Sequence, residues 1–374
     1  MNIYRLLYIQ DNSLVANYFR EKLENAGFMV QSASSVEEGC RKMEAQLPDV
    51  IVLDPLLPDG DAPESIISLR AEKGAAELPV FVLPTQQRPV AEAIEQQART
   101  QLLGRNGNIA LELIEAAAKV VDMQTGSLGE AAMHCVPDAR WRRAVLNAAP
   151  GALAEIRQTL HTVVRNPAGT ENIRQLLQNV HRFADQMVLL GASALSQVAS
   201  ALEILVFGLF QYPERIEPLT LRTLGQAVDF LAELLASPNA MQTGDLGAAH
   251  VMIVEDEANA RELIIAAMGL VGLTADGLDS PGASLAVLSS QPCDLIFLDI
   301  NLPEMNGFEL CTKLRAMPLH EKTPIVFLTG MNSFQNRVQS NLSGGNDFVG
   351  KPFNVAELGV KALIWVLRGQ FGLN

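Results

Sequence analysis

Four short apolar runs in the last third of the chain each lead to a polar side chain, and they follow one another at distances that leave room for a helix or a loop between them. The runs cover residues 251–256, 295–303, 325–330 and 348–352. Apolar runs of this length predict strands that are buried on both faces, as in a parallel sheet. Ligands of such sheets bind at the carboxyl ends of the strands. We therefore expect one edge to collect a set of groups suited to magnesium and phosphate, namely Glu255, Asp256, Asp299, Thr329 and Lys351.

The first third of the chain repeats this order of signals. An apolar run ends on Asp11, a second ends on Asp54, and a third covers residues 80–84. Patterns typical of amphipathic helices, such as residues 14–26 and 260–270, lie between the runs in both thirds. Strands that alternate with helices predict a doubly wound parallel sheet, here present at both ends of the chain.

The middle third has helical periodicity and no strand pattern. From about residue 138 to residue 235, prolines and glycines interrupt it at intervals that suit an antiparallel four-helix bundle. Turn-rich segments at 124–129 and 237–245 are interpreted as linkers. The expected domains are therefore residues 1–123, 138–237 and 248–374.

Composition limits the classes of function that fit. The net charge is −14 and the pI is about 4.9, which argues against nonspecific nucleic-acid binding because that requires a basic face. The four cysteines show no close metal-ligand spacing, and a strand-like segment begins within a few residues of the N-terminus, so we expect a reduced, cytoplasmic protein. The apolar segment 187–212 is interpreted as bundle core rather than as a membrane span, because polar residues interrupt it.

Residues 249–374 resemble the receiver domain of response regulators, with the whole set of motifs in order. The resemblance implies a flavodoxin-like sheet of five parallel strands and Mg²⁺ as cofactor. It implies Asp299 as the phosphoacceptor, with Lys351 and Thr329 contacting the phosphoryl group. It also implies three metal ligands besides Asp299, namely Asp256, Glu255 and the backbone carbonyl of Asn301. It further implies Phe348 as the aromatic residue that moves with Thr329 on activation.

The N-terminal copy resembles a receiver whose site is degenerate. Asp11 and Asp54 stand where Asp256 and Asp299 stand in the other copy. Gln10 replaces the first acid, and Pro84 replaces the threonine and has no hydroxyl. At the lysine position Arg105 offers a planar, longer head, so this exchange is not conservative. Leu102 stands at the aromatic position. We favour a structural or interaction role for this copy.

In the middle third, His181 is a candidate phosphoryl carrier. It lies on a polar stripe of the helix expected from residue 170 to residue 190, which predicts a solvent-facing imidazole able to act as a nucleophile. Residues 181–195 resemble the core of a histidine-phosphotransfer domain. Ala184 and Asp185 depart from the lysine and glycine of that family. Asp185 puts negative charge beside a phosphohistidine, so activity of His181 stays open. His161 lacks this pattern and is expected to be an ordinary, partly exposed residue.

Two hypotheses of different class follow. In the first, the chain is a phosphorelay protein whose Asp299 exchanges a phosphoryl group with a histidine. In the second, it is a scaffold or dimerisation module that phosphorylation of Asp299 switches. Neither is a metabolic enzyme, and both need a donor in trans, such as a sensor histidine kinase or a phosphotransfer protein. Nucleic acid and membrane are not expected partners, and a homodimer is left open. A third hypothesis, a phosphatase with an aspartyl-phosphate, fits poorly because Asn301 stands where such enzymes carry a second acid.

Overall fold

The computed structural model describes residues 4–83, 88–97, 99–103, 109–120, 139–167, 169–237, 246–330 and 343–373. Contacts divide the chain into two compact units, which are described separately. The first unit comprises Met1–Ala152 and Gln178–Leu190, and the second comprises Leu153–Leu177 and Gly191–Asn374. The linker expected at 124–129 and all but the first residue of the one expected at 237–245 lie outside the described residues, and the three-domain boundaries stay a prediction.

The first unit contains a five-stranded parallel sheet in the order β2-β1-β3-β6-β7. Its strands are β1 (Arg5–Ile9), β2 (Met29–Ala33), β3 (Val50–Leu53), β6 (Val80–Val82) and β7 (Thr100–Leu102). All four residues of β3 are buried, as expected for a central strand of a parallel sheet. A short antiparallel pair, β4 (Leu56–Leu57) and β5 (Gly60–Asp61), follows β3.

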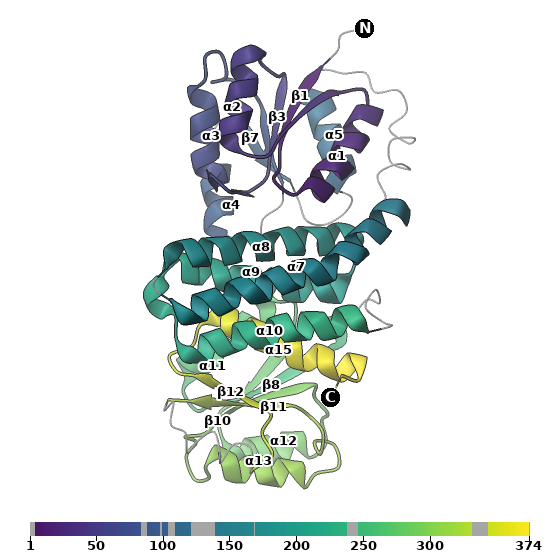
Figure 1. Cartoon of the computed structure of the whole chain (residues 1–374). Helices are drawn as coiled ribbons and strands as arrows, with labels where there is room; N and C mark the ends of the chain where they lie inside the picture. The colour runs from purple at the N-terminus through teal and green to yellow at the C-terminus, as the bar shows by residue number, and fades with distance from the viewer. Residues whose placement is uncertain are drawn as a thin grey trace. The chain divides into compact units, whose positions relative to one another are not determined.

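Helices cover both faces of this sheet (Figure 1). They are α1 (Ser13–Asn25), α2 (Val36–Ala45), α3 (Ala62–Ala71), α4 (Arg88–Glu95) and α5 (Ile109–Val120). Helices α1 and α5 lie on one face, where Phe19, Leu113 and Ile114 join one apolar core. Asn12 caps α1, because its side-chain oxygen accepts hydrogen bonds from the backbone amides of Leu14 and Val15.

The second unit repeats this architecture with the order β9-β8-β10-β11-β12, again all parallel. The strands are β8 (His250–Val254), β9 (Thr274–Leu278), β10 (Leu295–Asp299), β11 (Ile325–Thr329) and β12 (Asp347–Gly350). The helices are α11 (Ala258–Leu270), α12 (Pro281–Leu288), α13 (Gly307–Arg315) and α15 (Val355–Phe371). Helices α11 and α15 cover one face, and α12 and α13 cover the other (Figure 1). The predicted doubly wound sheet is confirmed at both ends of the chain.

The middle of the chain is helical, as expected. Its helices are α7 (Ala139–Arg165), α8 (Thr170–Leu190), α9 (Ser193–Gln211) and α10 (Pro218–Ala236), with single 3-10 turns at Pro213–Arg215 and Leu246–Ala248. Within the second unit, α9 packs against α10 and α15. Among the described residues, α9 is the one helix long and apolar enough to cross a membrane, and 67% of its most apolar window is buried inside the protein.

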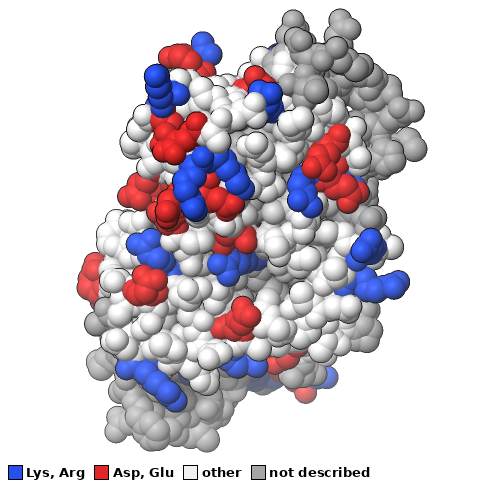
Figure 2. All heavy atoms as spheres, turned by 45° about the horizontal axis from the view of Figure 1, so that its top comes forward, with Lys and Arg blue, Asp and Glu red and all other residues white. Residues whose placement is uncertain are grey.

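Figure 2 shows one face of the surface. Among the residues coloured there, acidic and basic side chains lie interspersed between uncharged ones, rather than gathered into a broad patch of one sign.

Candidate functional site

Two carboxylates meet at the carboxyl edge of the second sheet because their strands are neighbours. Asp299 is the last residue of β10, and Glu255 directly follows β8, which pairs with β10 in parallel. Both side chains are buried, and Asp256 beside them is exposed. Oxygens of Glu255, Asp256 and Asp299 lie within 4.8 Å of one another. The sequence prediction that these acids converge is confirmed by this geometry.

Lys351 supplies the positive charge at this edge. It follows β12, and its Nζ lies 2.9 Å from Asp299 Oδ2 and 2.7 Å from Glu255 Oε2. Burial acts to lower the pKa of Lys351, but its hydrogen bonds with Glu255 and Asp299 outweigh burial and raise it. Burial raises the pKa of Glu255, and the hydrogen bond from Lys351 opposes this. The ammonium group is therefore held charged between two carboxylates.

The acidic cluster fits a magnesium ion. Magnesium prefers oxygen ligands and retains several waters, so it needs a few carboxylates that are open to solvent on one side. Asp299 and Glu255 are fixed within the protein, while Asp256 reaches the solvent. These three side chains would hold the ion. Asn301 lies at the same edge, and its backbone amide donates a 3.2 Å hydrogen bond to Asp299 Oδ1.

A close backbone approach fixes the loop that follows Asp299. A Cβ atom added at Gly307 would lie 2.2 Å from the backbone carbonyl oxygen of Asp299, so this position accepts only glycine. Gly307 begins α13, and its amide donates a 2.9 Å hydrogen bond to the carbonyl of Ile300. Asn306 caps the helix by accepting from the amide of Glu309.

The two remaining receiver positions, Thr329 and Phe348, lie on neighbouring strands. Thr329 ends β11 and is buried, and its backbone carbonyl accepts a 2.7 Å hydrogen bond from the amide of Lys351. Phe348 lies in β12 and is half-buried. The guanidinium of Arg222, from α10, stands over the Phe348 ring at 4.6 Å from its centroid. A helix outside the receiver fold therefore contacts the aromatic residue that the sequence singled out.

Helix α10 contacts the same face of the second receiver at further points. Lys361 of α15 is buried and forms a 2.6 Å ion pair with Asp347 and a 2.9 Å hydrogen bond with Gln226 of α10. Glu357 of α15 accepts hydrogen bonds from two threonines of α10, Thr220 and Thr223. These buried polar contacts tie α10 to α15 and β12. The sequence reasoning missed them, because no local pattern predicts which helix covers a receiver face.

The degenerate site of the first sheet also brings its acids together. Asp54 follows β3 and is fully buried, and Asp11 follows β1. The Gln10 side chain donates a hydrogen bond to Asp54 Oδ2, and the Leu56 amide donates one of 2.8 Å to Asp54 Oδ1. Gln10 thus does more than remove a charge, which is all that the sequence suggested. Pro84 and Arg105 lie outside the described residues.

The predicted exposure of His181 is wrong. Its side chain is 2% exposed, and its Nε2 lies 2.9 Å from Asp54 Oδ1. The imidazole is covered because this part of α8 faces the acidic edge of the first sheet. Asp185 does approach the imidazole, as the spacing of four residues predicted, at 3.5 Å from Nε2. Arg182 bonds to Asp11 at 2.7 Å, a contact whose only sequence signal was its position beside His181.

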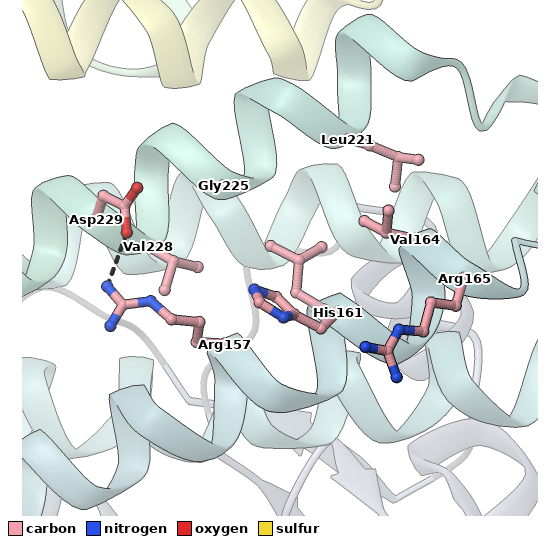
Figure 3. A pocket seen from close by; sticks show the side chains of 9 residues that line it. Arg157, His161, Val164, Arg165, Leu221, Gly225, Val228 and Asp229 are labelled. Carbon is pink, nitrogen blue, oxygen red and sulfur yellow. Dashed lines mark hydrogen bonds and ion pairs between the residues drawn. The ribbon is translucent and has the colours of Figure 1, made fainter.

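His161 is exposed, as expected, and lines a groove of about 310 Å³ in the second unit. Figure 3 shows that α7 contributes one wall and α10 the other. Arg157 on one wall donates a 2.7 Å hydrogen bond to Asp229 on the opposite wall. The rest of the lining is mostly apolar, for example Val164 and Val228.

Comparison with known proteins agrees with the geometry at both ends of the chain. The model of the response regulator receiver domain matches residues 6–107 and 251–362, together more than half of the chain.

Curated relatives match over one receiver-sized segment. The phosphate regulon transcriptional regulatory protein PhoB of Pseudomonas aeruginosa is 36% identical over 118 residues, which are 32% of this chain and 51% of that protein. The response regulator ArlR of Staphylococcus epidermidis is 33% identical over 121 residues, 32% of this chain and 53% of that protein. The chain thus spans about half the length of these relatives.

Among solved structures, the chemotaxis response regulator CheY4 of Vibrio cholerae is 28% identical, with a TM-score of 0.30. That match covers 32% of this chain and 98% of the other. With two parallel five-stranded sheets, an acidic edge on each, and family matches over both, the chain belongs to the response regulator receiver family and carries two receiver domains.

Proposed function

We propose that this chain is a two-component signalling protein that is phosphorylated on Asp299 of its second receiver. The observation that carries the proposal is the position of Lys351 Nζ, 2.9 Å from Asp299 Oδ2 and 2.7 Å from Glu255, beside the solvent-exposed Asp256. A carboxylate nucleophile, a cation for the phosphoryl oxygens and oxygen ligands for a metal are thereby gathered at one edge.

The transfer needs only in-line displacement. A carboxylate oxygen of Asp299 attacks the phosphorus of the donor, an O–P bond forms, and the bond between phosphorus and the leaving group breaks. The leaving group, a histidine nitrogen or the acetate of acetyl phosphate, takes the bonding electrons. Lys351 and the Thr329 hydroxyl hold the phosphoryl oxygens. When bound, Mg²⁺ neutralises charge on the two anions that must approach each other.

The phosphoryl donor acts in trans in this proposal. Receiver domains of this family take part in signalling with histidine kinases or phosphotransfer proteins, and such a partner would transfer a phosphoryl group to Asp299. The half-exposed Phe348 and its contact with Arg222 provide a route from the site to α10. We therefore favour a phosphorylation-switched scaffold, in which the state of Asp299 changes how α10 packs on the receiver.

A phosphorelay through His181 is the second candidate function. The motif around His181 and the four-helix pattern of the middle region support a histidine-phosphotransfer fold. The contact of His181 with Asp54 opposes activity in the form described here, because the imidazole nitrogen is buried and hydrogen-bonded. A relay would therefore require a second form in which α8 leaves the first receiver.

Intact-mass measurement after acetyl phosphate and Mg²⁺ tests the proposal. We expect one phosphoryl adduct on the wild type, the same adduct on Asp54→Ala and His181→Ala, and none on Asp299→Ala. Omission of Mg²⁺ should abolish the adduct. An adduct that survives Asp299→Ala would refute the assignment of the phosphoacceptor, and one lost in His181→Ala would support the relay.

A further inference from the structure

Three side chains on one face of α8 bond to the acidic edge of the first receiver. His181 Nε2 lies 2.9 Å from Asp54 Oδ1, and Arg182 lies 2.7 Å from Asp11 Oδ2. One turn further along, Gln186 donates a 3.3 Å hydrogen bond to the side chain of Asn12. Asn12 in turn donates one to the backbone carbonyl of Arg182. All of these residues belong to the first unit.

These contacts engage the two acids that a receiver normally uses for metal and phosphate. In the second receiver, Lys351 lies between Glu255 and Asp299. In the first, hydrogen bonds from Gln10, the Leu56 amide and His181 converge on Asp54, and Arg182 neutralises Asp11.

Burial and the neighbouring Asp54 raise the pKa of Asp11, while Arg182 lowers it, so the guanidinium offsets an otherwise unfavourable buried charge.

The start of α7 contacts both α1 and the end of α8. The Trp141 indole donates a 3.0 Å hydrogen bond to the carbonyl of Leu14, and its ring packs on Tyr18 at 5.3 Å between centroids. Arg142 donates a 3.0 Å hydrogen bond to the carbonyl of Leu190, the last residue of α8. The start of α7 therefore bonds to α1 through Trp141 and to the end of α8 through Arg142.

We propose that the first receiver is a metal-independent cap on His181, and that its intramolecular partner is the face of α8 that carries His181, Arg182 and Gln186. A phosphoryl group bonded to Nε2 needs the space that Asp54 Oδ1 occupies, and the Nε2–H that donates to Asp54 must first be lost to free the lone pair. Phosphoryl exchange through His181 therefore requires the cap to open. This explains why Gln10 replaces an acid, since its amide completes the hydrogen bonds of Asp54 where a second acid would repel it. The proposal concerns His181 and does not depend on phosphorylation of Asp299.

Histidine labelling of the full-length protein with diethyl pyrocarbonate tests the cap, because the chain has an internal reference. His161 is exposed and His181 is 2% exposed, so in the wild type we expect His161 to react rapidly and His181 to be protected. Peptide mass spectrometry reports the rate at each residue. Asp54→Ala removes the partner of His181, and Arg182→Ala removes the partner of Asp11 and so weakens the contact between α8 and the first receiver. Each substitution should raise the labelling rate of His181 by about tenfold.

Arg368→Ala is the matched control, because it breaks a 2.8 Å ion pair with Glu233 far from α8 in sequence. It should leave His181 protected. Circular dichroism and the thermal midpoint show whether each variant is folded, and Gln186→Ala provides a milder opening if Asp54→Ala unfolds. Equal labelling of His161 and His181 in the wild type would overturn the proposal, as would protection that persists in folded Asp54→Ala and Arg182→Ala.

A metal ion held by Asp54, His181 and Asp185 would also protect His181, since their ligand atoms lie within 4.8 Å of one another. Labelling is therefore repeated after treatment with EDTA. Unchanged protection supports the metal-independent cap, and protection lost with EDTA would overturn it in favour of a metal site. None of these measurements uses a phosphoryl donor, so their failure leaves the assignment of Asp299 untouched.

Discussion

Substitution of Arg222 by alanine should make Asp299 easier to phosphorylate. The guanidinium of Arg222 lies 4.6 Å from the centre of the Phe348 ring, within the range of a cation–π interaction. If Phe348 moves toward Thr329 when Asp299 is phosphorylated, this contact must be given up. Its loss in Arg222→Ala therefore removes a cost of activation.

The size of this cost follows from the exposure of the side chain. Arg222 is 43% exposed, so the cation–π contact is worth about 1 kcal/mol, nearer the value for exposed pairs than for buried ones. The ion pair of Arg222 with Asp347, at 3.5 Å, adds little because solvent screens it. A difference of about 1 kcal/mol changes an equilibrium constant about fivefold.

The assay is the phosphorylated fraction of the protein by intact mass at a series of acetyl phosphate concentrations with saturating Mg²⁺. Half-saturation should move to a concentration about fivefold lower in Arg222→Ala. Arg174→Ala is the matched control, because Arg174 has the same 43% exposure and stands 5.2 Å from the ring of Phe210, which belongs to α9 and not to the receiver sheet. An unchanged half-saturation in Arg222→Ala, or an equal shift in Arg174→Ala, would refute the reasoning.

Three further substitutions test the energetics of the second receiver. Lys351→Ala leaves buried Asp299 without its cation, so the thermal midpoint should fall without Mg²⁺ and recover in part with it; an equal fall under both conditions would contradict the metal site. Lys361→Met leaves Asp347, 2% exposed, without its main partner and should cost about 3–5 kcal/mol in urea unfolding. A smaller loss in the double variant with Asp347→Asn would confirm that the unpaired charge is the cause. Gly307→Ala places a Cβ 2.2 Å from a carbonyl oxygen and should cost at least about 2 kcal/mol, with loss of phosphorylation; wild-type stability would mean that the loop shifts freely.

The two sheets and the second site were predictable from the sequence because their signals are local. A buried parallel strand is an apolar run, and the polar residue at its end must lie at the carboxyl edge. The strand order is therefore enough to predict that one edge brings together Glu255, Asp299 and Lys351. The same logic placed Asp11 and Asp54 at the edge of the first sheet.

The environment of His181 was not predictable in this way. The helical stripe that carries it is polar, and a polar stripe on an isolated helix predicts exposure to solvent. Burial here depends on a surface more than a hundred residues away in sequence, whose acids supply hydrogen-bond partners for the stripe. Complementary charge, with Arg182 on the helix and Asp11 on the sheet, was present in the sequence, but nothing local pairs the two residues. The contact of Arg222 with Phe348 was not predicted from the sequence for the same reason.

The most direct test of the account is a count of beryllofluoride adducts per chain by fluorine-19 NMR in the presence of Mg²⁺. Beryllofluoride binds a receiver aspartate as a phosphoryl mimic, so each competent site gives one adduct. We predict one adduct, at Asp299, that disappears in Asp299→Ala and persists in Asp54→Ala. Two adducts on the wild type would show that Asp54 is accessible and would contradict a first receiver that is capped by α8. No adduct would contradict an intact site at Asp299.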